Sequence, residues 1–170
     1  MKKIIAMLIA AIMAILCVGA SAEAGMANPW TDTTADQAKA DLGYDFEIPE
    51  DADADSVTCR VNAELGMVEC TFTMDGAEYC FRMATSAVTD GIEDISGMNY
   101  EWELTESDHV GDLDATLMQA QDGENTVEVV IWQDVVPGFA YSLSTVQPDV
   151  DGLDLAAIAS MMYVPMQGEA

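Results

Sequence analysis

Basic residues are scarce in this chain. Five Lys and Arg stand against 31 Asp and Glu, which gives a formal charge of −26 at pH 7. Binding to nucleic acid needs clustered Lys and Arg to neutralise phosphates, so the composition argues against nucleic acid as a partner. Anionic lipids and phosphorylated substrates are disfavoured for the same reason. We therefore expect a soluble monomer whose partners are cations or basic protein surfaces.

Histidine and recognisable catalytic motifs are lacking too. The one histidine, His109, lies in a charged stretch that we expect to be an exposed loop, and one histidine does not make a His-rich metal site. The chain contains no Gly-x-Ser-x-Gly, no glycine-rich phosphate loop and no His-Glu-x-x-His. We predict no catalytic residue and no cofactor. The alternative is a small carboxylate-dependent hydrolase, because glycoside hydrolysis needs only a pair of carboxylates.

The N-terminus has the features of a secretory signal peptide over residues 1–22. A basic start, Met1-Lys2-Lys3, precedes seventeen uncharged and mostly apolar residues, and Ala20-Ser21-Ala22 is a small-x-small cleavage site. An uncleaved membrane anchor is the alternative, since seventeen residues is the lower limit for a span. Cleavage would leave three basic residues against all 31 acids, a charge of −28. The expected location is therefore secreted or in the cell envelope, with no membrane insertion after cleavage.

The remaining chain is expected to fold as one domain. Residues 23–31 look like a short leader, and residues 32–170 are assigned to a single α+β domain. Disordered acidic chains lack aromatic and β-branched residues, whereas this chain keeps three Trp, five Tyr and four Phe. Because strands and helices do not alternate along the sequence, a parallel sheet is not expected.

Two helices are predicted, one at each end of the domain. A short helix over residues 34–42 would be capped by Asp32 or Thr33 and would end at Gly43. A closing helix over about residues 153–163 would be capped by Asp151.

Between them, residues 56–84 alternate apolar and polar side chains in three successive runs, which predicts an antiparallel meander. Asp75-Gly76 is a favoured hairpin turn, and it would pair Cys70 with Phe81 and Phe72 with Tyr79.

Later strands follow the same pattern. Tyr100, Trp102 and Leu104 would face inward from a fourth strand. Residues 113–121 and 126–133 flank a second hairpin turn, and apolar residues on both faces of that hairpin predict a central position with its second side covered. A seventh strand begins at Phe139. The expected fold is an antiparallel sheet of about six or seven strands with a short N-terminal helix and a C-terminal helix.

Three cysteines follow the signal region. Cys59 and Cys70 fall on the inward face of adjacent strands. A four-residue loop would place them directly opposite each other, and a two-residue loop would place them diagonally. They are predicted to form a disulfide or to be two buried thiols. Cys80 would face outward, either as a reactive thiol or as an inert one covered by a helix.

One acidic stretch has the start of a calcium-loop spacing. Asp51, Asp53 and Asp55 alternate as the first ligands of such a loop do. The match then fails, because Ser56 replaces the required glycine and Asn62 replaces the bidentate glutamate. These three aspartates are candidate ligands for a divalent cation, and the alternative is a solvated acidic turn.

Several short motifs occur in an order that resembles a known type of protein. Asn28-Pro29-Trp30 precedes the first helix, Leu42-Gly43-Tyr44-Asp45-Phe46 follows it, Glu93-Asp94-Ile95-Ser96-Gly97 follows the meander, and Tyr141-Ser142-Leu143 comes late. Together they are similar to an uncharacterised family of exported or lipid-anchored bacterial envelope domains of unknown function. The resemblance covers most of residues 28–163 and implies no activity or catalytic residues. We expect a secreted, strongly acidic, non-enzymatic binding or envelope-associated domain.

Overall fold

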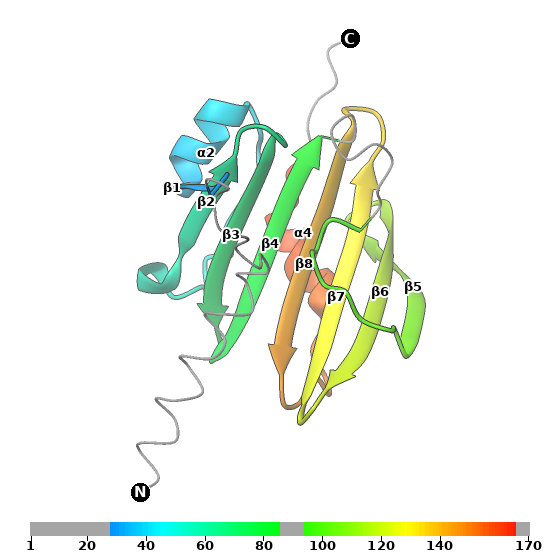
Figure 1. The fold of residues 1–170 in the computed structure, drawn as a ribbon. Coiled ribbons are helices and arrows are strands. Elements are labelled where there is room, and N and C mark those ends of the chain that lie inside the picture. Colours follow the sequence, from blue (N-terminus) through cyan, green and yellow to red (C-terminus); the bar gives the residue numbers. More distant parts are fainter. Residues whose placement is uncertain (1–27, 86–93, 166–170) are drawn as a thin grey trace, which may run out of the picture.

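A computed structural model describes residues 28–85 and 94–165 of the chain. They form one antiparallel sheet of eight strands with two helices, in the order β1-β2-β3-β4-β8-β7-β6-β5 (Figure 1). The elements are β1 (Thr31–Thr33), α2 (Ala35–Leu42), the 3-10 turn η1 (Ala54–Ser56), β2 (Thr58–Asn62), β3 (Met67–Met74), β4 (Ala77–Thr85), β5 (Leu104–Val110), β6 (Leu113–Asp122), β7 (Asn125–Asp134), β8 (Phe139–Gln147) and α4 (Leu155–Met162). The predicted signal peptide and most of the predicted leader lie outside the described residues.

The α+β fold with an antiparallel sheet is confirmed, but the sheet has eight strands and not six or seven. The extra strand, β1, lies where we expected the end of a leader and a helix cap, and it pairs with β2. The strand expected around Tyr100 and Trp102 is wrong, because β5 begins only at Leu104 and runs on through His109. Among the β5 residues only Val110 is buried, so this edge strand has almost no apolar alternation to predict it.

The register of the meander is confirmed. Cys70 pairs with Phe81 and Phe72 pairs with Tyr79 across the Asp75-Gly76 turn. Asp75 and Gly76 both have positive φ, as a tight two-residue hairpin requires.

The two faces of the sheet are covered differently. The main core lies on the face that carries α2 and α4, and it gathers the large aromatic side chains of β3, β4, β7 and β8. Figure 1 shows α4 behind the sheet and the segment that leads into β5 in front of it. That segment packs Met98, Tyr100 and Trp102 on Met118, Val127 and Val129. The central, doubly covered position predicted for the β6–β7 hairpin is therefore confirmed for β7, which lies between β8 and β6.

Both helix N-caps differ from the prediction. Thr34 caps α2 by accepting a hydrogen bond from the Gln37 amide, because Asp32 and Thr33 are part of β1. Asp154 caps α4 by accepting from the Ala157 amide at 2.9 Å, which displaces Asp151 from that role. The C-cap at Gly43 is confirmed, with φ of 69°. Within the described ranges, no helix has the length and apolarity needed to cross a bilayer.

Candidate functional site

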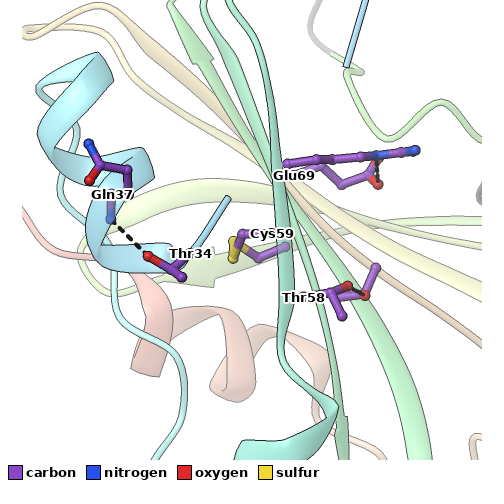
Figure 2. The surroundings of a disulfide bond; sticks show 8 residues. Thr34, Gln37, Thr58, Cys59 and Glu69 are labelled. Atoms are coloured by element: carbon purple, nitrogen blue, oxygen red, sulfur yellow. Dashed lines mark hydrogen bonds and ion pairs between the residues drawn. A yellow bond between two sulfur atoms is a disulfide. The ribbon is translucent and has the colours of Figure 1, made fainter. Parts of the chain in front are cut away.

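A buried carboxylate binds both arginines of the described chain. Glu69 on β3 is 2% exposed, and its Oε1 lies 2.6 Å from Arg60 Nε. Its Oε2 lies 2.8 Å from Arg82 Nε and 2.7 Å from Arg82 Nη2. Figure 2 shows Glu69 on the opposite side of β3 from Cys59 and α2. Two nitrogens of Arg82 thus converge on one oxygen of the carboxylate, in charge-assisted contacts.

Residues of two of the sequence motifs, Trp30 of the first and Ile95 to Gly97 of the later one, lie at this cluster. The Arg60 guanidinium lies over the Trp30 ring, 4.7 Å from its centre. Arg82 Nη1 donates a 3.1 Å hydrogen bond to the Ile95 carbonyl. A β-carbon at Gly97 would overlap Arg82, and its φ is 72°, so this position requires glycine. The two arginines that bind Glu69 thus also contact residues of two other segments, Trp30 before β1 and Ile95 before β5.

The third basic residue is also held by its own chain. Lys39 Nζ lies 3.9 Å from an Asp45 carboxylate oxygen and 5.2 Å from the centre of the Phe46 ring. Among the carboxylates of the described residues, Glu69, Glu128 and Asp134 are buried. Most of the others lie on the surface. The acidic surface therefore has no basic patch of its own within the part of the chain that the structure describes.

A hollow of about 450 Å³ lies at one end of the sheet, between the β5–β6 turn and the β7–β8 turn. Its lining residues are Asp112, Leu113, Asp114, Thr116, Ile131, Trp132, Gln133, Asp134, Val135 and Val136. We call it the Val135 hollow. Val135 and Val136 are 81% and 87% exposed. The exposed valines were not predicted, although two valines directly before Pro137-Gly138 in a turn are a detectable signal.

The aspartates of this hollow are not a desolvated pair. The Asp114 side chain is fully exposed and lies 3.4 Å from His109, whose exposed position is as predicted although it lies in a strand. Asp134 is buried and accepts a 2.6 Å hydrogen bond from Tyr163. Burial, followed by that hydrogen bond, raises the pKa of Tyr163 well above its usual value. Asp134 thus ties the end of β7 to the chain after α4.

A second cavity, of about 280 Å³, lies under the segment that crosses the other face of the sheet. Its lining residues are Glu78, Tyr79, Cys80, Gly97, Met98, Asn99, Tyr100, Ser144, Thr145 and Val146. Cys80 is 7% exposed, so of the two alternatives the covered thiol is the one observed. The segment that covers Cys80 is irregular and is not a helix. Residues 97–100 of this segment line the same cavity as Cys80. Glu78 is the one carboxylate in the lining.

Glu128 is a buried carboxylate in the core face of β7. It is 1% exposed, and its Oε2 has no hydrogen-bond partner within the described part of the chain. Burial raises its pKa to about 7, opposed by a hydrogen bond with Gln119 and supported by the negative charge of Asp154. Glu128 was not predicted, although a single glutamate between Thr126, Val127 and the apolar run that follows is a detectable signal.

The candidate calcium ligands form a local turn. Asp53 caps η1 by accepting a hydrogen bond from the Asp55 amide at 3.1 Å. All three aspartates, Asp51 included, are exposed. Over residues 28–85 and 94–165, no group of three or more His, Cys, Asp or Glu side chains is placed to hold a metal ion. The three exposed aspartates fit the solvated acidic turn, which is the alternative to a cation site.

This arrangement leads to a prediction about ionic stabilisation. Calcium chloride and sodium chloride at matched ionic strength should raise the melting temperature equally, because both screen the repulsion among surface carboxylates. Thermal unfolding with each salt, and with calcium plus a chelator, measures the difference. A larger gain from calcium that the chelator reverses would contradict this expectation and would show a bound cation.

The predicted disulfide is present. Cys59 and Cys70 are directly opposite each other in the β2–β3 ladder, and their sulfur atoms are 2.07 Å apart. Figure 2 shows Cys59 pointing to the side on which Thr34 and Gln37 lie. The four-residue loop is the one observed, since Asn62 pairs with Met67.

Replacing Cys59 and Cys70 together by alanine should lower the free energy of unfolding by about 2–3 kcal/mol, because the bridge closes a short loop in the unfolded chain. Urea unfolding without reductant measures the loss. The control is Cys80→Ala, which removes a buried thiol and leaves the bridge intact. A reductant should lower the unfolding free energy of the wild type and leave the double variant, which has no bridge, unchanged. An equal effect of reductant on both proteins would mean that the bridge contributes nothing to stability.

Comparison with known protein families, with curated proteins and with solved structures finds no match to this chain.

Proposed function

We propose that this protein is a secreted or envelope-associated, non-enzymatic domain that binds basic protein surfaces through its carboxylates. The observation that carries the proposal is that the basic residues of the described chain are paired within the chain itself. Lys39, Arg60 and Arg82 are each bound by an acid of the same chain. The surface acids are thus left for a partner to neutralise.

The charge supports a protein partner of opposite sign. The chain has 31 acidic and five basic residues, and this excess of negative charge attracts a basic partner over a distance and speeds its association. The same charge opposes contact between two copies of this chain and contact with anionic lipid. Export by the predicted signal peptide, and the resemblance to envelope domains, belong to the proposal and fit a partner outside the cytoplasm.

Pull-down from envelope extracts at low and high salt tests this function. The tagged protein should recover basic proteins at low salt and lose them at high salt, because exposed charge pairs are screened. A useful control is the same protein with exposed Glu50, Asp51 and Glu64 changed to their amides, which should recover less at intermediate salt. Recovery of the same partners at both salt concentrations, or of acidic partners, would contradict the electrostatic part.

The second candidate is a small carboxylate-dependent hydrolase. The Val135 hollow favours it to the extent that three aspartates line one concave surface. Hydrolysis needs one of two carboxylates to keep its proton, which requires burial or a close second charge. Asp114 is fully exposed and Asp134 is bound to Tyr163. Turnover of a panel of glycosides that Asp134→Asn abolishes without unfolding would support the hydrolase over the binding domain.

A further inference from the structure

Val135 and Val136 are unusual because neither the core nor the local turn accounts for them. They are the most exposed of the four large apolar residues that stand in solvent in the described chain, the others being Leu65 and Met161. The turn that contains them is made by Pro137 and by Gly138, whose φ is 79°. Turns favour polar or small residues, so two β-branched apolar side chains there gain nothing within this chain.

Their surroundings combine apolar and acidic groups. Partly buried Leu113 and Ile131 line the Val135 hollow beside the two valines. Asp112 in the β5–β6 turn and Asp114 at the start of β6 are exposed and line the same hollow. The other carboxylate, Asp134, is bound to Tyr163 and holds the end of β7 in place. A hollow lined by exposed valines, other aliphatic side chains and exposed carboxylates fits a ligand that is both aliphatic and positively charged.

We propose that the Val135 hollow is the docking site for a basic segment of a partner protein that carries aliphatic side chains. This inference rests on the proposed function and gives it a location. Val135 and Val136 would pack on the aliphatic side chains, while Asp112 and Asp114 would pair with Lys or Arg of the same segment. A second copy of this chain is the wrong occupant, because its charge of −26 would face the same exposed carboxylates. An anionic membrane is disfavoured for the same reason.

Two synthetic peptides of equal charge separate the apolar from the electrostatic contribution. One alternates lysine with valine and the other alternates lysine with serine. The variant V135S/V136S should weaken the lysine–valine peptide about tenfold, because two aliphatic contacts are lost. It should leave the lysine–serine peptide nearly unchanged. Both valines are exposed, so the double variant should keep the wild-type melting temperature.

A matched pair of charge variants tests the exposed carboxylates. D112N/D114N should weaken both peptides more than E50Q/D51N, which removes the same charge elsewhere. Glu50 and Asp51 lie just before Asp53, whose amide bonds to the Thr73 carbonyl. Thr73 pairs with Glu78, at the end of β4 opposite to Thr85, and Thr85 pairs with Phe139 beside the hollow. The control acids are therefore at the far end of the sheet.

Nuclear magnetic resonance of the labelled wild-type protein gives a readout that needs no variant. Addition of the lysine–valine peptide should shift the amide signals of Val135, Val136 and Asp112 more than those of Glu50 and Asp51. If shifts centre elsewhere, or if V135S/V136S leaves the lysine–valine affinity unchanged, the site is wrong while the proposed function stands. If the wild type binds neither peptide at low salt, both proposals fail. Binding to anionic vesicles that requires the valines would also overturn the protein-partner assignment.

Discussion

Replacing Glu69 by glutamine is expected to lower the free energy of unfolding by about 3–5 kcal/mol. The side chains of Arg60 and Arg82 are 22% and 16% exposed, and both direct a nitrogen at this carboxylate within 2.8 Å. A glutamine would take the shared negative charge away from two largely buried guanidinium groups, which costs more than losing the attraction itself. The loss should extend to the segment at Ile95, because Arg82 also holds its carbonyl.

Urea unfolding of Glu69→Gln against Glu64→Gln measures this effect. Glu64 is exposed in the β2–β3 turn, so the same chemical change there should alter stability by less than about 0.5 kcal/mol. A loss below about 1 kcal/mol at Glu69 would mean that the arginines are readily rehydrated, and that the cluster is not a structural centre.

Replacing Glu128 by glutamine is expected to have the opposite sign, with a gain of about 3 kcal/mol at pH 8. Burial holds the pKa of Glu128 near 7 in the folded protein, against 4.5 as its ordinary value. Between these two pH values the folded state keeps a proton that the unfolded state has lost. Stability therefore falls as pH rises through this window, and the penalty is constant above it. Glutamine has no charge to bury, so it removes the penalty.

Unfolding at pH 8 and at about pH 4 tests both the size and the sign. The gain of Glu128→Gln over wild type should be present at pH 8. It should nearly vanish at the lower pH, where the Glu128 carboxyl is largely protonated in the folded and in the unfolded protein. Taking the difference at each pH cancels the titration of the other acids. The control is Glu124→Gln, an exposed glutamate in the adjacent turn. An equal effect at both pH values, or a loss at pH 8, would contradict a buried, charge-disfavoured carboxylate.

The meander could be predicted because its turn chemistry and its apolar alternation agree. Asp75-Gly76 fixed the pairing of Cys70 with Phe81. The alternation placed Cys59 and Cys70 on one face but left direct and diagonal pairing open, and the structure shows the direct pairing. The β5 strand could not be found this way. An edge strand has a partner on one side only, and nearly all side chains of β5 are at least partly exposed. Its sequence therefore has almost no hydrophobic periodicity from which a strand could be predicted. The three-residue strand β1 is stabilised by its partner β2 and not by its own sequence.

The site was predicted less well, for a related reason. Glu69 alternates with apolar residues as a solvent-facing side chain would, and its burial depends on Arg60, Arg82 and a segment far along the chain. Such long-range charge pairing leaves no local pattern. The cover over Cys80 was expected to be a helix. The segment that provides it could not be predicted, because it is irregular and has no periodicity of its own. By contrast, the disulfide depends on two neighbouring strands and was within reach of the sequence.

The central claim is that the acidic surface of this domain binds a basic protein segment. Its most direct test is the affinity of the wild-type protein for the lysine–serine peptide, measured from low salt to about 0.5 M sodium chloride. A glutamate–serine peptide of equal length is the control and should not bind. The account predicts binding at low salt that weakens progressively as salt rises. Absence of binding at low salt, or an affinity that salt does not change, would contradict it.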